Sequence, residues 1–317
     1  MVRKDGSIAC WGDNSLGQLG VPLAKSGPFA SQPSNVEGLP LAPRAFSIGV
    51  GYTAACAALN DGQTWCWGTD PLGGATVGAD GGSTPAPTPR RLANAISAVD
   101  VRPSVSHTCA LTSPSVGVSA GEVWCWGYNF QGELGTAPMG PVPQPPMQVP
   151  AASLSNSQLL TGALSTCVLR VGKVYCWGSG ASGELGSTLE TATATPKAID
   201  GWKSVDVKHV ATTAGLTCAV KSDATVECIG RNDVNQLGRA SSPGATTSTP
   251  APVQGIDDAE RVTVVSTAAC ALRRKPGGRT RVSCWGSHQQ GLLGNGMPIL
   301  SDGSFVTSAT PVDVILP

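Results

Sequence analysis

A cassette of about eleven residues recurs six times along the chain, and it restricts the fold more than any other feature of the sequence. The copies read CWGDNSLGQLG, CWGTDPLGG, CWGYNFQGELG, CWGSGASGELG, CIGRNDVNQLG and CWGSHQQGLLG, and they begin at Cys10, Cys66, Cys125, Cys176, Cys228 and Cys284. Successive copies lie 51 to 59 residues apart. A period of this size, carried by Gly, Trp and β-branched residues, is typical of a propeller or solenoid built from repeated supersecondary units.

Each repeat contains a short series of β-strand patterns. In order it holds a Pro- and Thr-rich loop, a strand such as residues 204–210, a strand of Cys-Ala-Leu type, a tight turn and the Cys-Trp-Gly strand of the cassette. Three or four strands per repeat, with turn signals between them and no helical periodicity, predict a propeller blade. We therefore expect an all-β fold, a β-propeller with six recognisable blades.

No linker divides the chain, so we expect residues 1–317 to form a single β-propeller domain. The first repeat lacks the Cys-Ala-Leu strand, and residues 308–317 (SATPVDVILP) match the strand that opens other repeats. The first and last blades are therefore expected to be incomplete. Either the two ends combine to close a ring, or about one blade lies outside these residues.

Ten of the eleven cysteines fall into pairs by position. In each repeat from the second to the sixth, one cysteine lies in the Cys-Ala-Leu strand and another in the cassette, with turn signals between them. Cysteines that face each other across a hairpin in a non-hydrogen-bonded pair lie close enough for a disulfide. The expected pairs are Cys56–Cys66, Cys109–Cys125, Cys167–Cys176, Cys218–Cys228 and Cys270–Cys284, and Cys10 is left without a partner.

Five disulfides in register imply an oxidising compartment. We therefore expect an extracellular or periplasmic protein, although the N-terminus of this chain has no apolar signal-peptide core. The alternative is ten buried, reduced cysteines that serve only as hydrophobic residues. Zinc is disfavoured because the paired cysteines are spaced 9 to 16 residues apart and only His107, His209 and His288 are present. We predict no metal site and no cofactor.

The charge of the chain is low and balanced. It has 21 basic and 21 acidic residues, so the net charge is zero, whereas nucleic-acid-binding proteins normally carry clustered Lys and Arg. The one basic cluster, between Arg273 and Arg281, is interpreted as a solvated hairpin loop, with contact to a polyanion as the alternative. No stretch of about eighteen apolar residues occurs, so membrane insertion is not expected.

Seven of the eight tryptophans lie in the cassettes. Both faces of a propeller blade are covered by neighbouring blades, so packing between blades explains a repeated Trp better than ligand stacking does. The glycines of the G-x-L-G segment are interpreted as turn positions with positive φ. A phosphate-binding loop would need a following helix N-terminus, and no helix is indicated there.

The repeated pattern x-V-x-C-W-G-x-N-x-x-G-Q-L-G, followed by a Pro-containing loop, a strand and G-x-x-H-T-C-A-L, resembles the regulator-of-chromosome-condensation repeat family. The resemblance covers essentially the whole chain. It implies a seven-bladed propeller in the intact protein, and the paired cysteines resemble the branch found in exported bacterial proteins. Relatives include a nucleotide-exchange factor, a plant photoreceptor and a secreted β-lactamase inhibitor. Only His107 keeps the family's histidine, and the Trp and Arg that precede it in the photoreceptors are absent here.

A fold of this kind does not by itself determine function. Acidic residues such as Asp100 and Glu227 are scattered, and no catalytic constellation is visible. We therefore expect a non-enzymatic secreted or cell-surface module, a monomer or part of a larger protein, that binds another protein through loops on one face. The candidate contact residues are Tyr52, His107, Tyr128, Phe130, Arg231 and His288, with turn or core packing as the alternative for each.

Three alternatives remain open. The first is an inhibitor of a secreted hydrolase, which is a narrower form of the same hypothesis. The second is a nucleotide-exchange regulator of a small GTPase, which would require reduced cysteines and a cytosolic location. The third is a hydrolase or lyase with its site in the central channel, which would require convergent carboxylates or histidines on the inner strands.

Overall fold

The fold is known from a computed structural model, which describes residues 1–40, 42, 44–69, 86–92, 96–112, 121–150, 157–186, 192–239, 244–274, 277–297 and 306–315. The chain divides into two compact units, residues 1–166 (unit 1) and residues 167–317 (unit 2). The expectation of a single domain stays a prediction.

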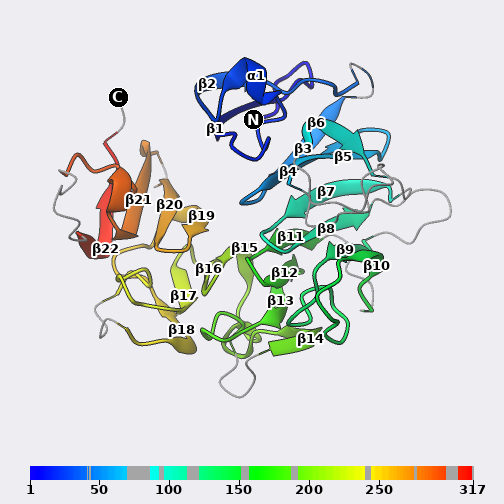
Figure 1. The fold of residues 1–317 in the computed structure, drawn as a ribbon. Helices are drawn as coiled ribbons and strands as arrows, with labels where there is room; N and C mark the ends of the chain where they lie inside the picture. The colour runs from blue at the N-terminus through cyan, green and yellow to red at the C-terminus, as the bar shows by residue number, and fades with distance from the viewer. Residues whose placement is uncertain are drawn as a thin grey trace. The chain divides into compact units, whose positions relative to one another are not determined.

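The described strands form five four-stranded antiparallel sheets and one two-stranded sheet, and nearly all regular structure is β (Figure 1). The two-stranded sheet consists of β1 (Ala9–Asp13) and β2 (Phe29–Asn35), with the short helix α1 (Leu23–Ser26) between them. The four-stranded sheets of unit 1 are β3 (Ala45–Val50), β4 (Ala54–Leu59), β5 (Thr64–Gly68) and β6 (Ala86–Arg91), and then β7 (Ala98–Pro103), β8 (His107–Thr112), β9 (Val123–Gly127) and β10 (Gln144–Gln148).

The next sheet holds β11 (Ser157–Thr161), β12 (Ser165–Arg170), β13 (Lys173–Ser179) and β14 (Ala192–Ala198), and the division between the units falls within it. The last two sheets are β15 (Val207–Thr213), β16 (Leu216–Lys221), β17 (Val226–Gly230) and β18 (Thr247–Pro252), and then β19 (Ala259–Val265), β20 (Ala268–Arg274), β21 (Thr280–Ser287) and β22 (Thr307–Asp313). Two 3₁₀ turns, η1 (Asp200–Trp202) and η2 (Gln289–Gly291), lie in unit 2. The predicted all-β propeller fold is confirmed, and each of the five larger sheets has four strands where three or four were expected.

Every four-stranded sheet follows the same order, and we call it a blade. A first strand pairs with the strand of Cys-Ala-Leu type, which pairs with the Cys-Trp-Gly strand (Cys-Ile-Gly in β17), and this strand pairs with an outer strand. The two cysteines of a blade lie opposite each other, as Cys56 and Cys66 do, and all five expected disulfides are present with Cα–Cα distances of 4.0–4.1 Å. Cys10 is a free, buried thiol.

The glycine after the cassette tryptophan has a steric reason. Gly68 has a φ of +94°, the pairing of β5 with β6 shifts register between Cys66 and Gly68, and a Cβ on Gly68 would lie 2.4 Å from the carbonyl oxygen of Thr53. Such a bulge needs a residue without a side chain, because left-handed backbone and close contact with the neighbouring turn coincide there. The glycine therefore joins the end of the cassette strand to the turn beside it.

The cassette tryptophan packs against the cassette of the preceding sheet. In the blade β3–β6, Trp67 is only 1% exposed and its indole N–H donates to the carbonyl oxygen of Gln18 at 3.0 Å. Gly20 leaves room for that ring, because a Cβ there would lie 3.0 Å from the indole nitrogen. Trp285 and Gly238 repeat this arrangement in unit 2. The packing interpretation of the tryptophans therefore holds for these two rings.

The end of the chain differs from expectation in one respect. The expectation that the last blade is incomplete is wrong, because β22 pairs with β21 and gives the sheet β19–β22 four strands. Residues 308–313 follow the sixth cassette in sequence and form the outer strand of the same blade. In the sequence they resemble the start of a repeat, so a sequence repeat and a structural blade do not begin and end at the same residues. The two-stranded sheet β1–β2 is the incomplete one.

The basic cluster is exposed at Arg274 and Arg279, as expected for a solvated hairpin loop, but it differs from expectation at Arg273. Arg273 is buried rather than solvated, and its guanidinium bonds the carboxylate of Asp258, the carbonyl oxygen of Gly255 and the hydroxyl of Ser283. Arg281 reaches the other oxygen of Asp258. These ion pairs hold the pKa of Asp258 below its usual value against the opposing effect of burial. Among the described helices, none is long and apolar enough to cross a membrane.

Candidate protein-binding face

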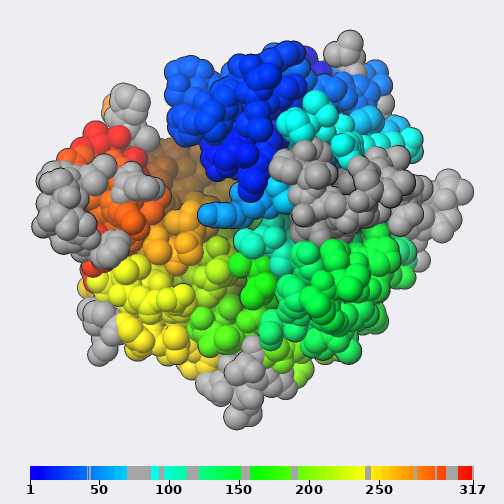
Figure 2. Space-filling view, in the orientation of Figure 1, coloured from blue at the N-terminus to red at the C-terminus, as the bar shows by residue number. Residues whose placement is uncertain are grey.

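The site begins with the turn between the first and second strands of each blade. In unit 1 these turns are residues 51–53, 104–106 and 162–164. They touch one another in sequence order, because a Cβ on Gly51 would lie 2.7 Å from the carbonyl oxygen of Ser104, whose hydroxyl donates to the carbonyl of Gly162. Ser106 donates to the carbonyl of Ala163 at 3.0 Å. The light-blue, cyan and green atoms of these segments meet in Figure 2.

The segment after each Cys-Trp-Gly strand lies at the same end of the blade. The backbone N–H of Tyr128 donates to the carbonyl of Ser106 at 2.9 Å, and that of Thr69 donates to the carbonyl of Thr53 at 2.8 Å. Antiparallel pairing causes this, since the start of the second strand lies beside the end of the third. The first turn and the cassette of one blade therefore present their side chains on one surface.

This surface of unit 1, which we call the turn face, carries exposed apolar and aromatic side chains. They are Tyr52 (79% exposed), Val105, Leu164 and Phe130, with Tyr128 half-buried. Phe130 stacks on Tyr128 with ring centroids 5.1 Å apart and an interplanar angle of 10°. Stacked and exposed aromatic rings of this kind are frequent anchors of protein interfaces.

The structure brings three of the predicted residues together on the turn face, namely Tyr52, Tyr128 and Phe130. Arg231 is exposed in unit 2 at the corresponding place, where its backbone N–H donates to the carbonyl of Gly215 at 2.7 Å and its guanidinium pairs with Asp233. Its contact role stays a prediction. Burial raises the pKa of the nearby Glu184 carboxyl.

The two histidines among the candidates are buried, which agrees with the alternative of core packing and not with a contact role. His107 is fully buried at the start of β8, where its Nε2 lies 2.7 Å from the hydroxyl of Thr166. That hydroxyl donates to the carbonyl of Glu133 at 3.1 Å, so its oxygen accepts a hydrogen bond from Nε2–H of a neutral imidazole. Burial lowers the pKa of His107 to about 3. His288 is also buried, with Nε2 donating to the carbonyl of Met297 at 3.0 Å.

Sequence reasoning missed Val105 and Leu164. Both lie in the segment that precedes the His-Thr-Cys or Ser-Thr-Cys sequence, and that segment is the exposed turn in every blade of unit 1. The sequence does contain a signal for these two residues, because each is an apolar residue at a turn position. In the described part of the chain, no group of three or more His, Cys, Asp or Glu side chains could hold a metal ion.

Comparisons with known proteins agree with the repeat pattern. Residues 171–220 match the Regulator of chromosome condensation (RCC1) repeat. The chain is 30% identical over 249 residues to E3 ubiquitin-protein ligase HERC2 of Homo sapiens, a match that covers 75% of this chain and 5% of that protein. It is 28% identical over 216 residues to the Secretion-regulating guanine nucleotide exchange factor of Bos taurus, covering 64% of this chain and 42% of that protein. The chain spans less than half the length of either relative.

Two solved structures share the fold. Human WBSCR16 has a TM-score of 0.76 at 20% identity, covering 97% of this chain and 78% of its own. Prp20p of Saccharomyces cerevisiae has a TM-score of 0.61 at 17% identity, covering 98% of this chain and 86% of its own. At these identities the likeness concerns the fold alone.

Proposed function

Because this chain is built from regulator of chromosome condensation (RCC1) repeats, we propose that it is a non-enzymatic protein-interaction module that binds another protein through the turn face of unit 1. The observation that carries the proposal is the group of exposed apolar and aromatic side chains on turns that contact one another. Aromatic anchors set in a rigid frame lose little conformational entropy on binding. The blades supply the frame, since each is closed by a disulfide.

The related structures support a protein partner. Prp20 has been solved bound to Kap60, and Prp20p is described with its binding to Gsp1p and histones. We carry over from these proteins only the class of ligand, which is another protein. The turn face of unit 1 has few charges among its exposed residues, so we expect apolar contacts rather than electrostatic attraction to dominate. Affinity should then change little with salt.

We further propose that the protein works in an oxidising compartment, outside the cell or in a periplasm. Five cross-strand disulfides in the same register support this, because such bonds persist where thiols are not kept reduced. A nucleotide-exchange role is the second candidate, favoured by the similarity to the bovine exchange factor. Counting the free thiols of the unreduced, denatured protein by mass spectrometry distinguishes the oxidising compartment from the nucleotide-exchange role. A single free thiol, at Cys10, supports the first, whereas eleven free thiols support a cytosolic regulator.

The binding proposal is tested by comparing variants at the two ends of one blade. A double variant, Tyr52→Ala and Phe130→Ala, removes two aromatic rings from the turn face; we call it the turn-face variant. Phe46→Ala is the matched control, because Phe46 is also an exposed aromatic ring but lies at the opposite end of β3. Each protein is immobilised, exposed to an extracellular or periplasmic fraction, and the retained proteins are quantified by mass spectrometry.

We expect at least one protein to be retained by the wild type and by Phe46→Ala, and to be lost by about tenfold or more from the turn-face variant. Retention that is equal in all three variants would overturn the proposal. Assay of the retained protein for hydrolase activity, with and without the propeller, tests the narrower hypothesis of a hydrolase inhibitor.

A further inference from the structure

The segment that carries the aromatic pair of the turn face folds around a buried glutamate. Glu133 is fully buried, and one oxygen of its carboxyl group accepts the backbone N–H of Gln131 at 2.6 Å. The backbone N–H of Phe130 and the hydroxyl group of Ser106 also hydrogen-bond this carboxyl group. The carboxyl group therefore connects the cassette of this blade to the turn between β7 and β8, which are the two segments that form the turn face here.

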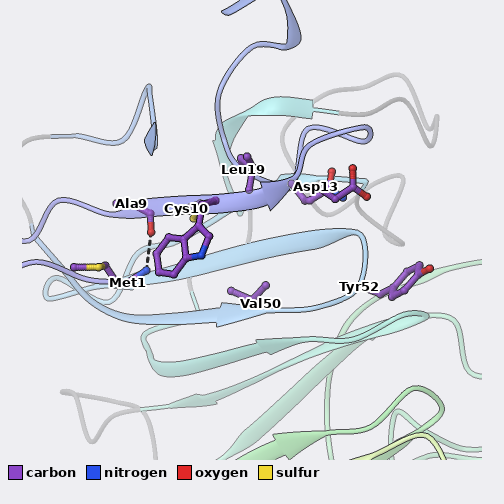
Figure 3. Close-up of a pocket in the computed structure, with 9 residues that line it drawn as sticks. Met1, Ala9, Cys10, Asp13, Leu19, Val50 and Tyr52 are labelled. Atoms are coloured by element: carbon purple, nitrogen blue, oxygen red, sulfur yellow. Dashed lines mark hydrogen bonds between the residues drawn. The ribbon is translucent and has the colours of Figure 1, made fainter. Parts of the chain in front are cut away.

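Glutamine takes the equivalent position in two other cassettes. The side-chain carbonyl of Gln18 accepts the N–H of Leu16 at 2.9 Å, and that of Gln236 accepts the N–H of Val234 at 2.9 Å. The Gln18 side chain also hydrogen-bonds the carboxylate of Asp13, which lies at the end of β1 (Figure 3). In the first cassette this position therefore supplies one oxygen acceptor and one N–H donor. A neutral carboxyl group offers a similar pair, because its second oxygen carries a hydrogen, whereas a carboxylate only accepts.

The hydroxyl group of Ser106 has a single hydrogen, and two other acceptors already face it. They are the carbonyl oxygen of Ala163 at 3.0 Å and Nδ1 of His107 at 3.3 Å, which carries no hydrogen when Nε2–H donates to Thr166. A Glu133 carboxylate would be a third acceptor for the same hydrogen, whereas a neutral carboxyl group donates to the Ser106 oxygen. Burial favours the same neutral form, because it raises the pKa of Glu133.

We propose that Glu133 is a positioning residue that keeps its proton while the aromatic pair is in place, and that loss of this proton releases residues 128–134 from the closed position in the structure. Glu133 acts through Tyr128 and Phe130, which stack on each other at the surface. A buried carboxylate is costly unless it is solvated or paired, so the charged form favours conformations in which this segment opens to water. The consequence for binding rests on the proposed function: the partner of the turn face binds more tightly at acidic pH.

The direction of the pH dependence follows from the two conformations of the segment. In the closed segment the pKa of Glu133 lies above its usual value of 4.5, and in an opened segment the carboxyl group meets water and returns to that value. The advantage of the closed segment is therefore complete below pH 4.5 and is lost as the pH rises through the closed-state pKa. The titratable groups on the neighbouring elements are His107 on β8 and Tyr128 in the segment itself, and β12 contributes the uncharged Thr166. Burial lowers the pKa of His107 to about 3, so the imidazole stays neutral above about pH 5.

Hydrogen exchange of the whole chain tests the role of this proton without a partner. The protection of the Phe130 and Gln131 amides, corrected for the intrinsic pH dependence of exchange, is measured by NMR between about pH 5 and about pH 8. In the wild type we expect it to fall by about tenfold or more as the pH rises, because each pH unit above the closed-state pKa favours the open form by up to about tenfold. In Glu133→Gln it should change by less than about twofold, since the amide N–H replaces the carboxyl O–H at every pH.

Two further variants separate the effect of the proton from the effect of changing the residue. Glu133→Leu introduces the residue that the sixth cassette has here, Leu292, and the amides of the segment should be weakly protected at both pH values. Glu184→Gln changes the equivalent glutamate of unit 2, whose pKa burial also raises, and should leave the pH profile of the segment as in the wild type. Wild-type protection that does not depend on pH would overturn the proposal, as would the wild-type profile in Glu133→Gln or strong protection in Glu133→Leu.

The consequence for binding is measured on proteins retained by the immobilised chain. We expect a protein that depends on the turn face to be retained about tenfold or more better at about pH 5 than at about pH 8 by the wild type, and equally at both by Glu133→Gln, because affinity scales with the closed fraction. Equal retention by the wild type at both pH values would overturn the regulation while leaving the turn face as the binding site. If no protein is retained through the turn face, the proposed function fails, and the exchange profiles still decide the role of Glu133.

Discussion

The sheet β1–β2 and the blade β3–β6 contain the same Cys-Trp-Gly sequence, but their surroundings differ. Trp67 packs against the cassette before it and is 1% exposed, whereas Trp11, in the first cassette of the sequence, is 53% exposed. Cys66 is bonded to Cys56, whereas Cys10 remains a thiol. A cassette thus supplies residues that depend on neighbouring strands and sheets for their role. Stability in such an array comes largely from contacts between adjacent units.

The largest expected effect is on the tryptophan pair. Trp67→Ala should lower the free energy of unfolding by about 3–5 kcal/mol, because it removes a large buried ring and leaves the carbonyl of Gln18 without its donor. Trp11→Ala should change it by about 0.5 kcal/mol or less, since the ring is already in contact with solvent. Urea unfolding followed by circular dichroism measures both. Similar losses for the two variants would show that Trp11 is covered in solution.

The cysteines should show the next largest difference. Replacing both Cys56 and Cys66 by alanine should cost about 2–4 kcal/mol, because the unfolded chain regains the freedom that the cross-link removes. Cys10→Ala should cost less, since only a small buried side chain is truncated. The check is urea unfolding without reductant. Addition of reductant should weaken both proteins, because the other four disulfides are present in each, and it should bring the stability of the wild type close to that of the reduced double variant.

Much of this comparison could be predicted from the sequence, because both features are periodic. Paired cysteines like Cys56 and Cys66 occur in five repeats, and a tryptophan like Trp67 occurs in five of the six cassettes, so one interpretation applied to most of the sheets. Exposure at single sites was not predictable in the same way. His107 lies one residue from an exposed turn, and its burial depends on Thr166, which is distant in sequence. Arg273 is buried for a similar reason, through Asp258.

The turn face was only partly predictable for the same physical reason. The sequence shows Tyr52 and Phe130 as aromatic residues in turns, and they lie on the turn face because antiparallel pairing places the first turn and the cassette at one end. Val105 and Leu164 join them through contacts between blades, which a single repeat does not reveal. The assignment of residues 308–313 to an outer strand likewise depended on pairing with β21.

A smaller effect on the free energy of unfolding is expected from the buried His107. The blade β3–β6 has Ala54 at the equivalent position. The folded-state pKa of His107 is about 3, below the unfolded value near 6.5. Between these values the unfolded chain binds a proton that the folded chain does not, so folding stability falls as the pH falls. The dependence is at most about 1.4 kcal/mol per pH unit.

The variant His107→Gln should remove that part of the pH dependence. Urea unfolding of the wild type and the variant at several pH values between about 4 and 7 gives the difference. Burial raises the pKa of the neighbouring Glu133, which acts in the opposite direction, but this carboxyl is present in both proteins and cancels in the comparison. His209→Gln in unit 2 should change the pH dependence in the same direction, because burial lowers the pKa of that imidazole as well. Parallel pH profiles for wild type and His107→Gln would mean that the imidazole reaches solvent.

The smallest expected effect concerns the reactivity of the one cysteine that the first sheet leaves free. Burial raises the pKa of the Cys10 thiol above its ordinary value, so at about pH 8 less thiolate is present in the folded protein than in the unfolded chain. Alkylation by iodoacetamide should therefore be slower in buffer than in urea, and it should speed up with pH by about tenfold per unit below the pKa. Trp11→Ala should change this rate only by uncovering the neighbouring thiol, without altering its pH slope. If Cys10 were alkylated as fast in the folded protein as in urea, β1 would have to open readily at Cys10. The strands β1 and β5 would then differ in local stability as well as in disulfide pairing.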